Sequence, residues 1–319
     1  MRSLLNIGAL LSFKHKGSIT LLGAICIGAL VGYVSHSMRL RYNLGAGDFN
    51  WALKTAHALI YSYDPYAFTP SSLLVAYPLP VALFGLPLLW LPNTLAATIF
   101  FGCSSGLLAY GIMKNEQPWR LLIFLTFPYW FALCYAQWSP LIAAAWFIPV
   151  LAPLLVLIKP HIALPVAINR ITPTGVVLAG LALLTSFAIM PDWLWRWLAT
   201  TREFESKYIL LTLPFGPFLL LAVLRWRNEE ARLLLSMAVL PFRGLYDLVA
   251  LYLIPRSARQ MVVLVSLSWL PMFLHGTIPE TQLITLCSFL PALGILFIPS
   301  INRDALSKSY GKSTERLQT

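Results

Sequence analysis

The stretch GSITLLGAICIGALVGYVSHSM, from Gly17 to Met38, decides the fold class of this chain. His36 is the one ionisable side chain within it. A membrane-spanning helix needs about 20 consecutive apolar residues, and this run is long enough for one. It is too long for the apolar part of a signal peptide, and it lacks a convincing small-residue cleavage site. We therefore predict a first transmembrane helix over residues 18–38.

The rest of the chain has the same character. It is 58% hydrophobic and only 11% charged, whereas a soluble domain carries roughly 25% charged residues. Two further stretches, Pro65 to Met113 and Leu121 to Ile158, contain no charged residue at all. A water-soluble fold cannot hide this much apolar surface. The predicted fold class is all-α, a polytopic transmembrane helix bundle that forms one integral membrane domain over residues 1–319.

The apolar segments predict about 10 to 12 spans. An N-terminus inside the cell makes residues 39–70 the first outer loop and residues 191–207 the second, and residues 300–319 become a basic cytoplasmic tail. Residues 231–255 are too few for two full crossings and are interpreted as a re-entrant hairpin with Arg243 at its tip. The other predicted helices cover residues 71–91, 94–113, 119–136, 139–158, 172–190, 208–224, 260–275 and 280–299.

The net charge of +11 is spread over short links between apolar segments. Basic residues precede the first helix at Lys14 and Lys16, and others cluster at 225–232, 256–259 and 303–316. Lys and Arg gather in the cytoplasmic loops of membrane proteins. This distribution favours membrane topology and anionic lipid over nucleic-acid binding, and we expect no nucleic-acid partner.

The few acids are informative because they are so rare. Asp48 and Asp64 both lie in the first outer loop, with Lys54 and His57 between them. The spacing from Phe49 to Tyr63 predicts a short amphipathic helix in the membrane interface. Asp48 stands where the N-cap of that helix would be, so one interpretation is a helix cap. The other is a functional carboxylate, the default for an ionisable residue at membrane depth.

Other polar residues interrupt long apolar segments. Lys159 in LLVLIKPHIALP could extend toward an interface. Arg243 and Asp247 in LPFRGLYDLVALY could form a structural ion pair, and Gln137 in CYAQWSPL could bond a neighbouring helix. Each of these residues could instead belong to a functional site. The sequence contains no phosphate-binding loop, dinucleotide motif, HExxH or GxSxG, so we expect neither a metal nor a cofactor.

The layout resembles the multi-spanning GT-C glycosyltransferases, and among them glycosyltransferase family 87. The motifs that carry the resemblance run in order from about residue 45 to 165: GDFNWALKTAHAL, YDPY, AYPLPVALFGLPLLWLP, AQWSPLI and LIKPHIALP. One departure is Ala136, because the family usually has glycine before the glutamine. The spacing from Gln137 to Lys159 is also short for the family.

The resemblance implies a sugar transferase, with mannose as the family default. The donor would be a sugar on a polyprenyl phosphate and the acceptor a membrane lipid or glycan. The active site would face the periplasm from a bacterial inner membrane. Asp48 would be the general base, with Asp64 as second choice, and Lys159, Arg243 and Arg202 would contact the phosphate. The remaining substrate-binding candidates are His57, Tyr66, Tyr77, Gln137, His161, Tyr246 and Asp247.

Two other interpretations stay open at this point. A transporter or lipid flippase would also use intramembrane charges and broken helices, but it predicts pseudo-symmetric halves, and the second half has no counterpart of the DF…DPY pattern. A non-catalytic membrane scaffold is the third interpretation.

Overall fold

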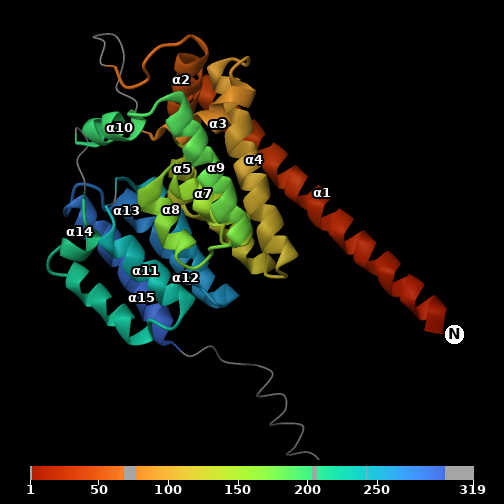
Figure 1. Cartoon of the computed structure of the whole chain (residues 1–319). Coiled ribbons are helices and arrows are strands. Elements are labelled where there is room, and N and C mark those ends of the chain that lie inside the picture. The colour runs from red at the N-terminus through yellow and green to blue at the C-terminus, as the bar shows by residue number, and fades with distance from the viewer. Residues whose placement is uncertain (1, 68–76, 203–206, 242, 299–319) are drawn as a thin grey trace, which may run out of the picture.

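The computed structural model describes residues 2–67, 77–202, 207–241 and 243–298, with residues 2–16 as backbone only. These residues form helices joined by turns, and they include no β-strand (Figure 1). The predicted all-α class is therefore confirmed for the described part of the chain. The longer α-helices are α1 (Arg2–Tyr42), α2 (Phe49–Ile60), α4 (Asn93–Lys114), α9 (Pro173–Ile189), α10 (Trp193–Thr201), α11 (Glu229–Val239) and α12 (Ala258–Ser268).

Several helices are long and apolar enough to cross a membrane. Within the described residues there are three, Gly17–Tyr42, Asn93–Lys114 and Glu280–Phe297, or up to four if the bent pair of α9 and α10 is one span. These coincide with the spans predicted at 18–38, 94–113, 280–299 and 172–190. The chain thus has the composition and helix lengths of a membrane protein. The larger predicted number of spans stays a prediction.

The middle of the chain consists of short helical pieces rather than the two continuous spans predicted at 119–136 and 139–158. Each piece has a proline in its first turn. Proline lacks an N–H and clashes with the preceding turn, so a helix restarts there instead of continuing. The pieces are η3 (Pro118–Leu125), α5 (Phe127–Cys134), α6 (Ser139–Ala144), η4 (Pro149–Leu151), α7 (Ala152–Val156) and α8 (Pro160–Ala167).

Short pieces also replace several other predicted helices. The described part of the predicted helix 71–91 is divided among η1 (Leu79–Val81), α3 (Ala82–Gly85) and η2 (Leu86–Leu88). The later pieces are η5 (Ile209–Leu211), η6 (Gly216–Arg225), η7 (Leu245–Leu253), α13 (Leu270–Phe273), α14 (Glu280–Ile284), the π-helical η8 (Thr285–Phe289) and α15 (Leu290–Phe297). The predicted tail 300–319 lies outside the described residues.

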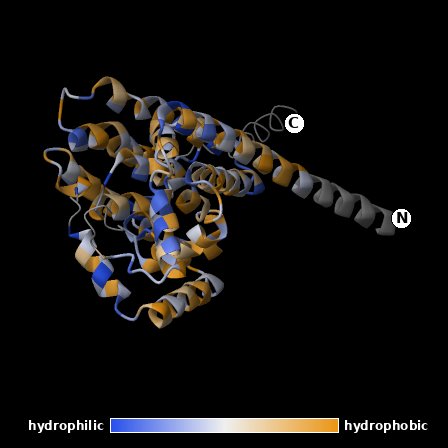
Figure 2. Cartoon of the chain, turned by 90° about the horizontal axis from the view of Figure 1, so that it is seen from above, coloured by the Kyte–Doolittle hydropathy of each residue, from blue (hydrophilic) through white to orange (hydrophobic). Residues whose placement is uncertain are grey.

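Helices α1 and α4 pack against each other in antiparallel directions (Figure 1). Their backbones touch where glycines face each other, because a Cβ on Gly28 would lie 2.9 Å from the carbonyl oxygen of Gly102. Helix α1 extends beyond the bundle at its N-terminal end (Figure 1). From residue 17 onward its side chains are described, and hydrophobic residues alternate with more polar ones along it (Figure 2). The end of α1 that leads to Asp48 and the end of α4 at Lys114 therefore lie at opposite ends of the bundle.

Two short helices cover the end of the bundle where α1 finishes. The predicted amphipathic helix in the first outer loop is α2, whose Phe49 stacks on Phe100 of α4 with ring centroids 4.2 Å apart. Helix α10 follows α9 after a bend of 98° and lies across the same end of the molecule (Figure 1). These two helices frame the cavity described next.

Candidate active site

A cavity of about 450 Å³ opens between α2, α10 and the short helices of the middle segment. Its walls combine acidic, basic and aromatic side chains, which is unusual for a chain this apolar. Ligand sites commonly have such a small set of convergent polar groups in an apolar frame. The lining residues are Asp48, Trp51, Tyr77, Pro78, Ile158, Lys159, Pro160, His161, Trp197, Thr201, Pro241, Arg243 and Tyr246.

Asp48 is delivered to the cavity by a turn that requires glycine. Gly47 has a φ of +56°, and a Cβ there would lie 2.2 Å from the carbonyl oxygen of Tyr135. That close approach lets the Asp48 N–H donate to the Tyr135 carbonyl at 2.7 Å. Asp48 does occupy the N-cap position of α2, but its side chain makes no capping hydrogen bond. Its Oδ2 accepts from the Tyr77 hydroxyl at 3.0 Å, so the helix-cap interpretation is wrong.

Gln137 is buried and lies in the turn between α5 and α6. The residue before it, Ala136, has a φ of 45°, in the left-handed region that L-residues other than glycine rarely adopt. From this turn the amide Nε2 of Gln137 donates to Oδ2 of Asp48 at 2.5 Å. Gln137 therefore contacts the carboxylate across the bundle instead of simply bonding an adjacent helix.

Lys159 projects into the same cluster because it precedes Pro160, the first residue of α8. A residue before proline is pushed out of the helical region, and Lys159 has φ −139°. Its Nζ donates to Oε1 of Gln137 at 2.6 Å. The same atom lies 3.8 Å from Oδ2 of Asp48 and 3.5 Å from Oδ1 of Asp247. With only 4% of its surface exposed, Lys159 does not extend to an interface, and that alternative is wrong.

Asp247 closes the far side of the cluster from helix η7. Its Oδ2 accepts from the backbone N–H of Arg243 at 3.2 Å and lies 3.6 Å from Nε2 of His161. The neighbouring Tyr246 places its ring 5.0 Å from the Lys159 ammonium. Asp247 thus balances the charge of Lys159. Both side chains are buried, and buried charges are tolerated only when they are paired.

Arg39 is a member of this arrangement that was not predicted from the sequence. It is 1% exposed near the end of α1 and donates to the carbonyls of Gly45 at 2.7 Å and Leu133 at 2.9 Å. Gly45 precedes the turn that carries Asp48, and Leu133 precedes the turn that carries Gln137. The guanidinium therefore ties the two turns together. In the sequence, Arg39 looks like an ordinary arginine at the end of a membrane-spanning helix. The one signal of a buried role was the glycine-rich NLGAGD that follows it, because glycines allow the chain to turn closely around a side chain.

Four predicted residues lie outside both the cavity lining and the cluster around Lys159. Asp64 pairs with Arg196 of α10 and accepts from the backbone N–H of Tyr66 at 2.9 Å. The hydroxyl of Tyr66 donates to the carbonyl of Tyr77 at 3.1 Å, which supports the Tyr77 segment from behind. His57 and Arg202 are exposed. The structure thus brings together Asp48, Tyr77, Gln137, Lys159, His161, Arg243, Tyr246 and Asp247 from the predicted set.

No protein-family model, curated protein or solved structure matches this chain. The resemblance to GT-C glycosyltransferases therefore rests on the sequence motifs, and a function must be inferred from those motifs and from the geometry of the cavity.

Proposed function

We propose that this chain is a membrane glycosyltransferase of the GT-C type, with the larger number of spans predicted above. It moves a sugar, with mannose as the default, from a polyprenyl phosphate to a lipid or glycan acceptor at the outer face of a bacterial inner membrane. The observation that carries the proposal is the Asp48 carboxylate, held at the wall of a polar cavity beside Lys159 and near Arg243.

Asp48 is the proposed general base. Among the described residues, the hydrogen bonds that hold its side chain come from Tyr77 and Gln137, and both go to Oδ2. Oδ1 is therefore the oxygen that we assign to the acceptor proton. The carboxylate is 25% exposed, so a substrate can reach it. A fixed carboxylate within hydrogen-bond reach of a hydroxyl is the geometry that general base catalysis needs.

The cations divide into two roles. Lys159 is already close to Asp48, Asp247 and the carbonyl of Gln137. We therefore assign to Lys159 the task of balancing the negative charge of both acids. Arg243 also lines the cavity, and its guanidinium can bind phosphate oxygens through two parallel hydrogen bonds. We assign the contact with the donor phosphate to Arg243.

The proposed step balances without a cofactor. The acceptor hydroxyl loses its proton to Asp48 as its oxygen forms a bond to the anomeric carbon. The bond between that carbon and the phosphate oxygen breaks, and the polyprenyl phosphate leaves with the electron pair. Attack opposite the leaving group inverts the anomeric centre. Trp51 and Trp197 line the cavity from α2 and α10 and offer flat apolar faces to a sugar ring.

The test is sugar transfer by the purified protein in lipid, with polyprenyl-phosphate mannose and a panel of membrane acceptors. Asp48→Asn keeps the size of the side chain but cannot take the proton, so we expect transfer to fall about 10²- to 10⁴-fold. Asp192→Asn, which neutralises an exposed acid outside the cavity lining, is the matched control. Equal transfer by Asp48→Asn and wild type would rule out Asp48 as the base. Movement of the lipid donor across the bilayer without transfer would instead support a flippase.

A further inference from the structure

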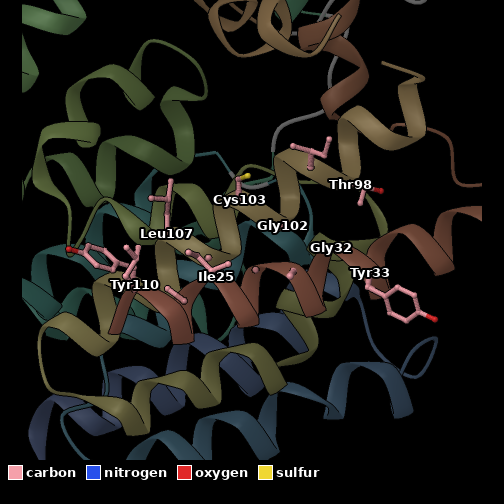
Figure 3. A pocket seen from close by; sticks show the side chains of 14 residues that line it. Ile25, Gly32, Tyr33, Thr98, Gly102, Cys103, Leu107 and Tyr110 are labelled. Atoms are coloured by element: carbon pink, nitrogen blue, oxygen red, sulfur yellow. The ribbon is translucent and has the colours of Figure 1, made fainter. Parts of the chain in front are cut away.

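A long furrow runs between α1 and α4 on the outside of the bundle. Its volume is about 740 Å³. It follows α1 from Leu21 to Tyr33 and α4 from Tyr110 to Thr98, and Figure 3 shows Tyr110 at one end and Tyr33 at the other. At about 1.5 Å per helical residue this part of α1 is roughly 18 Å long, which is close to the length of one extended acyl chain.

The glycines of both helices form the floor of this furrow. Gly28 and Gly32 of α1 face Gly102 and Gly106 of α4, and a Cβ at Gly102 would lie 2.9 Å from the Gly28 carbonyl oxygen. Because the backbones meet directly, there are no side chains along the line of contact. The walls consist of apolar side chains such as Ile25 and Leu107 (Figure 3).

A second hollow of about 400 Å³ adjoins the furrow at the end nearest Lys114. Tyr110 lines both spaces, and Lys114, Thr172 and Thr174 line the second one. The Lys114 ammonium lies 5.6 Å from the centre of the Tyr110 ring. The apolar furrow and the second hollow therefore share Tyr110, and the second hollow supplies a positive charge and two hydroxyl groups.

We propose that the two hollows together bind one anionic glycerophospholipid. An acyl chain lies along the α1–α4 furrow, and the phosphate headgroup meets Lys114, Thr172 and Thr174. Because the bilayer is as apolar as the furrow, burial of the chain does not distinguish one lipid from another. The charge of Lys114 distinguishes anionic lipids from neutral ones, since one basic residue near the membrane surface favours an anionic lipid by roughly five-fold.

This site is separate from the Asp48 cavity, and the proposal does not depend on the proposed transferase activity. Lys114 ends α4, whereas Asp48 follows α1, so in an antiparallel pair the two residues lie at opposite ends. The lipid would therefore sit in the leaflet opposite the cavity.

The test uses the full chain in nanodiscs that contain equal amounts of phosphatidylglycerol and phosphatidylcholine. Lipids that stay bound after release are counted by native mass spectrometry. We expect wild type to retain phosphatidylglycerol about five-fold over phosphatidylcholine. Lys114→Gln, at an exposed position, should abolish that preference, and Ala29→Phe should fill the furrow and lower the retention of both lipids. Leu30→Phe, an exposed neighbour outside the furrow, is the matched control.

Three outcomes would overturn the proposal. Equal retention of the two lipids by wild type would remove the headgroup site. Retention that is unchanged in both Lys114→Gln and Ala29→Phe would show a general lipid coat without a site. A dimer that Ala29→Phe converts to monomer would show that the furrow holds a helix of a second copy. A thermal scan checks that Ala29→Phe is folded, and Lys114→Gln tests the headgroup site without altering the furrow.

Discussion

The Gln137 amide donates to Oδ2 of Asp48 at 2.5 Å, and its orientation follows from chemistry. The Lys159 ammonium can only donate hydrogen bonds, and an ionised carboxylate can only accept them. The Gln137 carbonyl oxygen must therefore face Lys159, where the separation is 2.6 Å, and the NH₂ group must face Asp48. Gln137 therefore links the Lys159 ammonium to the Asp48 carboxylate through one hydrogen bond to each.

Replacement of Gln137 with methionine keeps the approximate volume and removes both hydrogen bonds. Two charged partners lose a contact at a buried position, so we expect a loss of about 1.5–3 kcal/mol in the free energy of unfolding. Sugar transfer should fall as well, because Asp48 loses one of the two groups that orient it. Thermal unfolding in detergent and the transfer assay measure the two effects. Gln282→Met, at a more exposed glutamine, should stay within about 0.5 kcal/mol of wild type.

Lys159→Met tests the charge balance of the cluster. Removal of the cation leaves Asp48 and Asp247 without the ammonium that they share, and loss of one partner of a buried pair costs about 3–5 kcal/mol. The second substitution Asp247→Asn should restore a large part of that stability, because it removes the more deeply buried of the two negative charges. A double-mutant cycle on the melting temperature measures the coupling. Purely additive effects would contradict the role of Lys159 as a counter-charge.

Ala136 is the position where the sequence departs from the glycine of the GT-C pattern. Its φ of 45° costs an L-residue roughly 1–2 kcal/mol, but its methyl group is also fully buried. Ala136→Gly relieves the backbone strain but loses the buried methyl group, so we expect the free energy of unfolding to change by no more than about 1 kcal/mol. Ala136→Val should be far more destabilising, because a β-branched residue does not adopt this conformation. A more stable Val variant would disprove the assigned backbone geometry.

Arg39→Met should disable the site although Arg39 does not line the cavity. The guanidinium holds the Gly45 and Leu133 carbonyls, so its loss releases both turns and should cost about 3 kcal/mol. Arg39→Lys keeps the charge, but a lysine lacks the planar guanidinium that binds both carbonyls. We expect its melting temperature to lie between those of wild type and Arg39→Met. Arg41→Met, at an exposed position of the same helix, should resemble wild type in both stability and transfer.

Asp64 should influence substrate binding more than chemistry. Its pairing with Arg196 holds α10, and α10 contributes Trp197 to the cavity wall. Asp64→Asn is therefore expected to raise KM several-fold and to leave kcat nearly unchanged, which steady-state kinetics of sugar transfer measure. Asp192→Asn removes the other carboxylate bound to Arg196 and serves as the comparison. If Asp64→Asn instead slowed turnover by about 10²-fold or more, Asp64 would be a catalytic carboxylate in its own right.

Apolar composition predicted the helical class and the helices now seen as α1 and α4, because hydropathy reports directly on the solvent around a segment. It could not predict the breaks between α5 and α8. Apolar residues look the same in one long helix and in several short ones, and the effect of each proline depends on tertiary packing. Lys159 and Asp48 were recognisable because charges are rare in this chain. Their contact through Gln137 joins distant segments, which a single sequence does not reveal.

The positions of the cluster along the chain affect how it forms. Asp48 and Gln137 are 89 residues apart, and Asp247 lies later still, on η7. A chain made from its N-terminus therefore contains Lys159 and Asp48 before Asp247 has been synthesised. Contacts of such long range form slowly compared with local helical contacts. Until η7 docks, Lys159 has Asp48 but not Asp247 beside it. A nascent chain stopped before residue 245 would therefore be helical but would lack the second acid of the cluster. Docking of η7 therefore completes the charges of the site while α12 and the helices after it are still to be added.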